Sequence, residues 1–246
     1  MTVLPWVTPE TPLPDPAYAQ PDGLLAAGLD LSPSRLHEAY SKGIFPWFNE
    51  GDPVLWWSPD PRMILACNDL VVSRSLAKKL RQVQRHEVDP QPDWQIRVDT
   101  AFEAVMNACS APRNHQPGTW ISPQIKMAYC QWHLAGKAHS IETWYRNDLV
   151  GGLYGVSLGR FFFGESMFSR ATDASKLALV YLVQFLRTQG VEYIDCQQET
   201  AHLASLGARP VSRQVFLKRL ESALMHAEPQ WQCGPLLQCG EFASTN

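Results

Sequence analysis

The chain has 246 residues, of which 45% are hydrophobic and 18% are charged, and its formal net charge is −3. These values are typical of a globular protein with one large core or two domains, and the charge excludes a surface that attracts nucleic acid everywhere. No apolar run approaches the roughly 20 residues that span a bilayer, and the N-terminal stretch lacks the pattern of a secretory signal. We therefore expect a cytoplasmic protein that does not contact a membrane.

The six cysteines give no sign of a metal site. They stand at positions 67, 109, 130, 196, 233 and 239, without a CxxC pair and without a Cys/His cluster at zinc-ligand spacing. Cysteines spaced in this way are typical of reduced and mostly structural residues. We therefore expect no bound metal.

Residues 1–70 are rich in proline and tryptophan and are predicted to form a small N-terminal domain. Ser32 as a cap, Pro33 at the first helical position and Gly43 at the end predict a short helix. The following stretch, GIFPWFNEGDPVLWWSPDPR, combines five aromatic residues with four prolines. That composition favours a rigid aromatic surface over regular strands, and exposed rings in it could stack on bases.

The segment from Val71 to His86 is predicted to be a helix with a basic face. It contains no acidic residue and five cations, which are Arg74, Lys78, Lys79, Arg81 and Arg85. Two interpretations are open: the basic face follows a phosphate backbone, or it is simply a solvated helix surface.

After residue 71 helices and strands are mixed, which indicates an α/β domain over residues 71–246. Ser122 and Pro123 begin a helix that ends at Gly136, and Asn147 with Asp148 marks a turn. The other expected elements are a helix near 100–109, strands at 138–146, 149–156, 160–165 and 191–197, and a helix between the last two strands. The tail from residue 226 is expected to pack as an extended arm.

The last two strands carry polar residues that are suited to chemistry. Glu165 follows three buried phenylalanines, and a charge at the end of a buried strand is unfavourable without a partner. In strand 191–197 the alternation places Tyr193, Asp195 and Gln197 on one face. Asp195 and Gln197 should therefore emerge side by side.

Asp173 and Gly190 mark the start and the end of the helix between these two strands, which indicates a crossover between parallel strands. Ligands bind at the carboxyl ends of the strands in such units. Structural roles stay open for both carboxylates, because Asp195 could cap a neighbouring loop and Glu165 could pair with Arg170.

Nine short segments follow one another along the chain: GIFPWF, LWWSPDPR, GTWIS, HSIETW, VGGLYGV, FFFGESMFSR, ASK, IDCQ and ASLGA. In this order they resemble bacterial leucyl/phenylalanyl-tRNA–protein transferases over residues ~20 to ~220. The strand order is also that of an acyltransferase fold. We therefore expect an α/β (α+β) protein, with the small N-terminal domain at 1–70 and an acyl-CoA N-acyltransferase-like (GNAT-like) catalytic domain with a mixed sheet at 71–246.

The resemblance implies an aminoacyltransferase that moves Leu, Phe or Met from aminoacyl-tRNA onto proteins with an N-terminal Arg or Lys, which marks them for degradation. Its partners would be these two substrates, and neither DNA nor a membrane. Aminoacyl-tRNA is already an activated ester, so an amine can attack it without ATP or a metal, and we expect no cofactor. The enzyme must position the reactants and stabilise the developing charge.

By resemblance, Asp195 and Gln197 form the catalytic pair: Gln197 accepts a hydrogen bond from the attacking amine, and Asp195 favours the ammonium that forms. Glu165 is expected to bind the cationic side chain of the acceptor. The basic face of 71–86 would contact the body of the tRNA.

Two larger sets complete the expected site. The terminal adenosine of the tRNA is expected near Tyr40, Trp47, Trp120 and Tyr129. The donor side chain is expected in a pocket of Leu153, Phe162, Leu179, Leu182, Leu186 and Ile194. Plain core packing explains the helical leucines as well, because they are spaced by three and four residues.

Three other functions are considered. A coenzyme A-dependent N-acetyltransferase would need a glycine-rich phosphate-binding segment, whereas SRATDASK has no glycine and places Asp173 at the helix start. A peptidoglycan-branching aminoacyltransferase usually has a duplicated domain and is longer. A non-catalytic RNA-binding module would leave Glu165, Asp195 and Gln197 unexplained.

Overall fold

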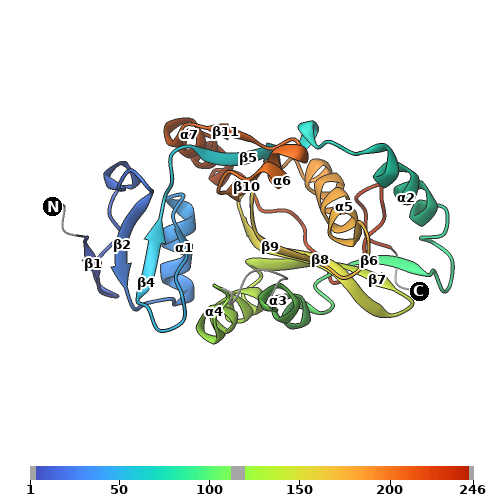
Figure 1. The fold of residues 1–246 in the computed structure, drawn as a ribbon, viewed down its shortest axis with the longest axis horizontal. Coiled ribbons are helices and arrows are strands. Elements are labelled where there is room, and N and C mark those ends of the chain that lie inside the picture. The colour runs from blue at the N-terminus through green and yellow to red at the C-terminus, as the bar shows by residue number, and fades with distance from the viewer. Residues whose placement is uncertain (1–3, 112–119, 244–246) are drawn as a thin grey trace.

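The computed structural model describes residues 4–111 and 120–243 of the chain. It contains two β-sheets, a four-stranded sheet from the N-terminal part and an eight-stranded sheet that occupies the rest of the molecule (Figure 1). No helix in these two ranges combines the length and the apolar character that crossing a membrane requires.

The small sheet has the strand order β1-β2-β4-β3. Its strands are β1 (Trp6–Val7), β2 (Leu24–Gly28), β3 (Phe45–Pro46) and β4 (Val54–Trp57). Helix α1 (Pro33–Ser41) is capped by Ser32, whose hydroxyl accepts a hydrogen bond from the Arg35 amide, so the predicted cap is confirmed. A short 3-10 helix, η1 (Pro16–Tyr18), precedes β2.

The prediction that the Pro/Trp stretch avoids regular strands is wrong, because β3 and β4 lie within it. Phe45 and Trp56 are buried on these strands, and their burial favours pairing despite the prolines. Pro46 is tolerated because β3 is the edge strand of its sheet.

The large sheet is mixed, as predicted. Its order is β11-β5-β10-β9-β8-β7-β6-β12. Only β9 and β10 pair in parallel, and the other neighbouring strands are antiparallel. The strands are β5 (Arg62–Ala66), β6 (Trp94–Val98), β7 (Ala138–Tyr145), β8 (Asp148–Leu158), β9 (Phe161–Ser169), β10 (Tyr193–Gln197), β11 (Arg209–Val211) and β12 (Gly234–Pro235). Strand β5 already belongs to this sheet, so the chain passes from the small sheet to the large one between β4 and β5.

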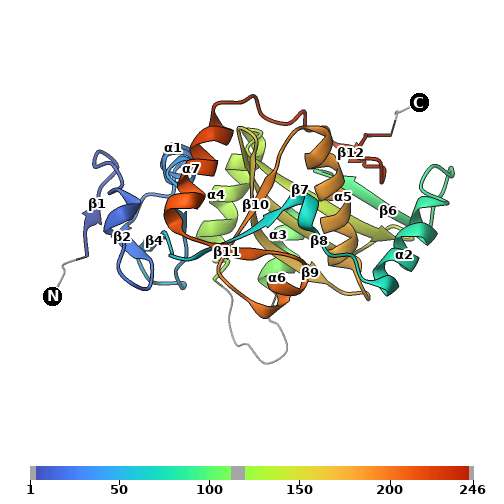
Figure 2. The same ribbon diagram turned by 90° about the horizontal axis from the view of Figure 1, so that it is seen from above.

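Helices cover both faces of the large sheet, as Figures 1 and 2 show. Side chains of α2 (Arg74–Gln84) and α5 (Ala174–Thr188) pack in one core. Those of α3 (Phe102–Ser110), α4 (Pro123–Leu134) and α7 (Arg213–Leu224) pack in another, which also contains the N-terminal sheet and α1. Two short helices, η2 (Cys67–Asp69) and α6 (Ala201–Ser205), complete the fold.

Several local predictions are confirmed and others need correction. The tail adds β12 to the sheet edge and stacks Trp231 on His139, so it is an extended arm. The β7–β8 turn falls at Arg146 and Asn147, one residue earlier than expected, because these two adopt positive φ. Asp173 precedes α5, but its side chain accepts from Lys176 and does not cap the helix.

Two β-bulges lie next to each other in the middle of the sheet. In β9, Glu165 is the extra residue, because Gly164 pairs with Gly155 and Ser166 pairs with Tyr154. Strand β9 therefore continues past Glu165 to Ser169, and Glu165 is not at its end as expected. In β10 the register shifts between Asp195 and Gln197, and parallel pairing with β9 extends only to Asp195.

The bulge in β9 depends on a close backbone approach at Gly155. A Cβ atom there would lie 2.2 Å from the carbonyl oxygen of Phe163 and 2.5 Å from a ring carbon of Phe162. We expect Gly155→Ala to lower the free energy of unfolding by about 1–3 kcal/mol, because backbone must shift to admit the methyl group. Urea denaturation measures the change.

Gly164, which pairs with Gly155, supplies the control. A Cβ at Gly164 would meet no atom closer than 3.5 Å, so Gly164→Ala should change stability by no more than about 0.5 kcal/mol. Equal stability of the two variants would show that the bulge does not require glycine at 155.

Candidate active site

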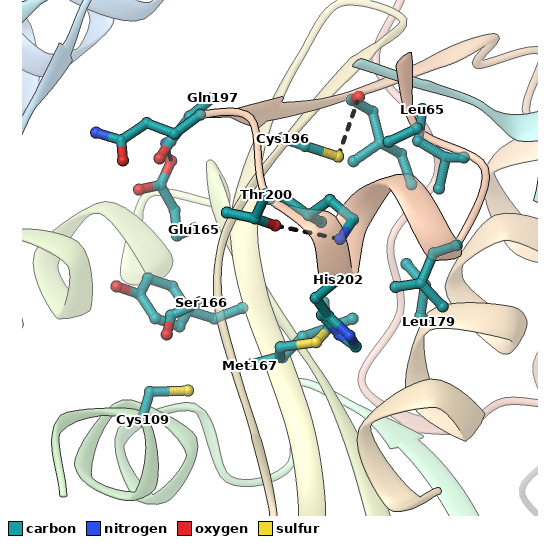
Figure 3. A pocket seen from close by; sticks show the side chains of 18 of the residues that line it. Leu65, Cys109, Glu165, Ser166, Met167, Leu179, Cys196, Gln197, Thr200 and His202 are labelled. Atoms are coloured by element: carbon teal, nitrogen blue, oxygen red, sulfur yellow. Dashed lines mark hydrogen bonds between the residues drawn. The ribbon is translucent and has the colours of Figure 1, made fainter. Parts of the chain in front are cut away.

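A cavity of about 1060 Å³ opens where β9 and β10 stop pairing. Its lining residues come from α3, β5, β8, β9, β10, α5 and α6 and from the N-terminal part. Figure 3 shows Glu165 and Gln197 on one side of this cavity, and Leu179, Met167 and His202 on another. A cavity of this size can hold much more than one amino-acid side chain.

Glu165 places a carboxyl group in the wall of the cavity. One carboxylate oxygen accepts hydrogen bonds from the Tyr40 hydroxyl at 2.7 Å and from the Gln197 side-chain amide at 3.0 Å. Burial raises the pKa of Glu165 to about 7, although these two hydrogen bonds act in the opposite direction. The carboxyl group can therefore change its charge near neutral pH.

The predicted alternative, a structural pair between Glu165 and Arg170, is wrong. Arg170 donates a hydrogen bond to the carbonyl of Leu149 and lies over the ring of Phe168. The bulge turns Glu165 toward the helices α1 and α4 instead.

Tyr40 and Tyr129 are fully buried beneath Glu165. Their hydroxyls share a hydrogen bond, and the Tyr129 hydroxyl also lies 3.5 Å from the second carboxylate oxygen. Burial raises the pKa of both phenols well above the usual value, so they stay protonated and can donate. These rings were expected near the terminal adenosine, but they cannot stack on it because protein atoms cover them completely.

Trp47 and Trp120 do line the cavity. Trp47 is 40% exposed, and its ring packs edge-on against Trp57 at a centroid distance of 5.5 Å. The side-chain nitrogen of Trp57 donates to the carbonyl of Trp47 at 2.7 Å, which fixes the backbone there. Trp47 and Trp120 thus provide aromatic surface in the same cavity as Glu165 and Gln197.

Asp195 does not emerge beside Gln197, contrary to expectation. Its side chain is fully buried and faces Arg62, which donates from Nε at 2.8 Å and from a terminal nitrogen at 2.6 Å. Gln197 instead lines the cavity, since the bulge and its φ of 62° turn it away from Asp195. Arg62 was not predicted from the sequence as part of the site. A buried aspartate requires a cationic partner, and Arg62 is the cation at the end of LWWSPDPR.

Five of the six residues expected in the donor pocket line the cavity: Leu153, Phe162, Leu179, Leu182 and Ile194. Leu186 does not, because it lies one turn beyond Leu182 and is fully buried in the core. Further lining residues come from distant segments and were not predicted; they include Leu65, Met167, Cys196, Leu203, Leu206 and Ala208. No local pattern connects these segments, so only the fold shows that they share a wall.

The basic segment forms α2, and four of its five cations, Arg74, Lys78, Arg81 and Arg85, are exposed. None of the four makes an ion pair with any residue in the described part of the chain. Lys79 differs, because its ammonium lies 3.6 Å from the centre of the Trp94 ring and burial lowers its pKa. The exposed surface of α2 therefore carries four free positive charges and not five.

The exposed cations are not among the residues that line the cavity. Helix α2, which carries most of them, contacts α5 and lies beside it in Figure 2. In the described residues no group of three or more His, Cys, Asp and Glu side chains could hold a metal ion.

Two solved structures show weak similarity to this chain. The structure of L-PGS from Bacillus licheniformis is 13% identical, with a TM-score of 0.34 over 86% of this chain and 66% of that one. A domain of a putative lysylphosphatidylglycerol synthetase from Agrobacterium fabrum is 16% identical, with a TM-score of 0.33 over 80% and 58%. These scores support no conclusion about function.

Comparison with sequences is decisive. The family model described as leucyl/phenylalanyl-tRNA protein transferase matches residues 64–221, and the model of its N-terminal domain matches 29–60. Proteins named leucyl/phenylalanyl-tRNA–protein transferase are 59% identical in Bordetella bronchiseptica, over 96% of this chain and 94% of the relative, and 56% identical in Chromobacterium violaceum, over 92% and 94%. The chain is an enzyme of the leucyl/phenylalanyl-tRNA protein transferase family.

Proposed function

We propose that this enzyme transfers Leu, Phe or Met from aminoacyl-tRNA to proteins with an N-terminal Arg or Lys in the cytoplasm, and so marks them for degradation. The observation that carries the proposal is the position of Glu165 and Gln197. They are hydrogen-bonded to each other and line one cavity together with apolar residues such as Phe162 and Leu179 and with Trp47 and Trp120.

This arrangement supports a definite placement of the donor. The apolar wall around Phe162 and Leu179 accommodates an unbranched or aromatic side chain, and Trp47 and Trp120 offer stacking surfaces to the terminal adenosine. The ester carbonyl then lies between the two parts, next to Gln197. A polar group at that point can act on the reacting atoms.

Gln197 is oriented for this task. Its amide nitrogen donates to Glu165, so its amide oxygen is available to accept a hydrogen bond from the attacking amine. An α-amino group has a pKa of about 7.7–8.0, and a useful fraction is already neutral at cytoplasmic pH. The enzyme therefore needs to aim the amine rather than to remove a proton with a strong base.

Glu165 provides the negative charge that an N-terminal Arg or Lys side chain would meet. A cation close to this carboxylate favours its ionised form and opposes the effect of burial. Buried Tyr40 and Tyr129 keep the carboxylate in place by hydrogen bonding. Acceptor selectivity would then depend on one charge-assisted contact.

An acetyltransferase function is less compatible with the start of α5. The Asp173 carboxylate lies there, where it would repel the pyrophosphate of coenzyme A, and it is held by Lys176. An RNA-binding module would not require the buried network around Glu165.

One assay separates these functions. The protein is incubated with a peptide that begins with Arg and either radiolabelled Leu-tRNA or radiolabelled acetyl-CoA. We expect label to reach the peptide from the tRNA only, and a peptide that begins with Glu to remain unlabelled. Label from acetyl-CoA, or equal labelling of both peptides, would contradict the proposal.

Gln197→Ala should reduce the rate of transfer at saturating substrates by about tenfold or more, or at least ~1.4 kcal/mol, because the attacking amine loses its hydrogen-bond acceptor. Single-turnover kinetics measures this rate. The adjacent Gln198 also lines the cavity but makes no hydrogen bond with Glu165, so Gln198→Ala serves as the matched control and should lose less than about threefold. Equal losses in both variants would remove the specific role of Gln197.

Binding of the acceptor side chain should strengthen as pH rises through about 7, because the raised pKa of Glu165 leaves the carboxyl neutral below this value. A peptide that begins with N-acetylarginine keeps the guanidinium but has no amine to titrate, and its inhibition constant measures this binding. In Gln197→Ala the midpoint should move to higher pH, since one hydrogen bond that stabilises the carboxylate is lost. An inhibition constant that does not change between pH 6 and 8 would contradict the role of Glu165.

Replacing Arg74, Lys78 and Arg81 with Ala should weaken tRNA binding. It should also flatten the slope of log affinity against log salt by roughly two to three units, about one per lost phosphate contact. The control is Lys79→Ala, which removes the contact with Trp94 and should leave the slope unchanged. Phenylalanyl-adenosine, which has no acceptor stem, should react equally fast with the triple variant. An unchanged slope in the triple variant would identify α2 as a solvated surface.

A further inference from the structure

Arg62 lies behind the active site without forming part of the cavity wall. It begins β5, next to Met63, which pairs with Gln197 across the two strands. Its side chain is 1% exposed. Arg62 therefore cannot touch a substrate, and any effect on the reaction must pass through other residues.

The Arg62 guanidinium contacts two aromatic rings and a carboxylate, while one of its terminal nitrogens has no hydrogen-bond partner among the described residues. It lies between the rings of Phe45 and Phe216, at 4.7 and 4.5 Å from their centres, and donates two hydrogen bonds to the Asp195 carboxylate. Phe45 belongs to the N-terminal sheet and Phe216 to α7. A planar guanidinium suits this stacked and bidentate geometry, and the ammonium of a lysine cannot reproduce it.

Asp195 in turn holds the backbone of Gln197. The carboxylate oxygen that accepts from Nε of Arg62 also accepts from the amide nitrogen of Gln197 at 2.8 Å. Gln197 has a φ of 62°, a left-handed conformation that is unfavourable for a residue with a side chain. The Asp195 carboxylate thus stabilises the backbone conformation from which the Gln197 side chain reaches Glu165.

We propose that Arg62 is a positioning residue for the transfer reaction, which it serves by orienting Asp195 and thereby the backbone of Gln197. The inference rests on the proposed function for its kinetic consequence. It also changes the role expected for Asp195, because the carboxylate holds the Gln197 backbone and does not face the amine. The alternative is an ion pair that stabilises the fold and has no effect on the site.

Arg62→Lys tests the proposal, because it keeps the charge and loses the planar bidentate contact. We expect the rate at saturating substrates to fall by about tenfold or more, while KM for the donor and for the peptide changes less than about threefold. Arg35→Lys is the matched control. Arg35 is 3% exposed and bonds Glu38 and the backbone of the N-terminal part, so this variant should lose stability without losing rate in the folded fraction.

Amide hydrogen exchange at Gln197 gives a second measurement, made without substrate. The Gln197 N–H is bonded to Asp195 in the wild type. Its exchange should be faster in Arg62→Lys and unchanged in Arg35→Lys. If Arg62→Lys does not fold, the same exchange and rate measurements are made on Asp195→Asn, which keeps the shape and weakens both the Arg62 and the Gln197 contacts.

The outcomes are distinct. A wild-type rate in folded Arg62→Lys, or a loss that matches Arg35→Lys, would overturn the proposal, as would unchanged exchange at Gln197. A wild-type protein that transfers no label from charged tRNA would overturn the proposed function instead, and the exchange measurement would still decide whether Arg62 orients Gln197.

Discussion

The buried ion pair between Arg62 and Asp195 is the contact on which the site depends most. Burying two charges is unfavourable unless the geometry is good and the remaining polar atoms are satisfied. Both carboxylate oxygens of Asp195 are used here, and one of them also accepts from Gln197, whereas one terminal nitrogen of Arg62 has no hydrogen-bond partner among the described residues. Because the guanidinium also contacts the N-terminal sheet and α7, one interaction links the assembly of the fold to the conformation of a cavity residue.

The cavity itself is a consequence of sheet geometry. A strand that pairs regularly would point alternate side chains to opposite faces and leave no opening. The bulges at Glu165 and after Asp195 break this alternation in two adjacent strands, and parallel pairing ends at the same level. Bulges re-aim side chains at the expense of ladder hydrogen bonds. The sheet therefore loses regular pairing at the level where Glu165 and Gln197 turn toward the cavity.

Several local features were predictable from the sequence, whereas the side-chain contacts that join distant segments at the site were not. The caps at Ser32 and Ser122 and the stop at Gly190 depend on residues within one helical turn, and the structure confirms them. The direction of Asp195 depends on Arg62, which is 133 positions away, and simple alternation placed it on the wrong side. Tyr40 illustrates the same limit, since a ring expected on a base is buried beneath Glu165.

The two faces of the large sheet separate two physical tasks. On one face, α1 and α4 bring Tyr40 and Tyr129 to Glu165, so a polar network is held by rigid helices. On the other face, α5 supplies Leu179 and Leu182 to an apolar wall that needs only shape and size. The opening between β9 and β10 joins the two environments. A substrate with an apolar side chain beside a reactive ester matches this division, because the ester must leave the apolar wall in order to reach the hydrogen-bonding groups.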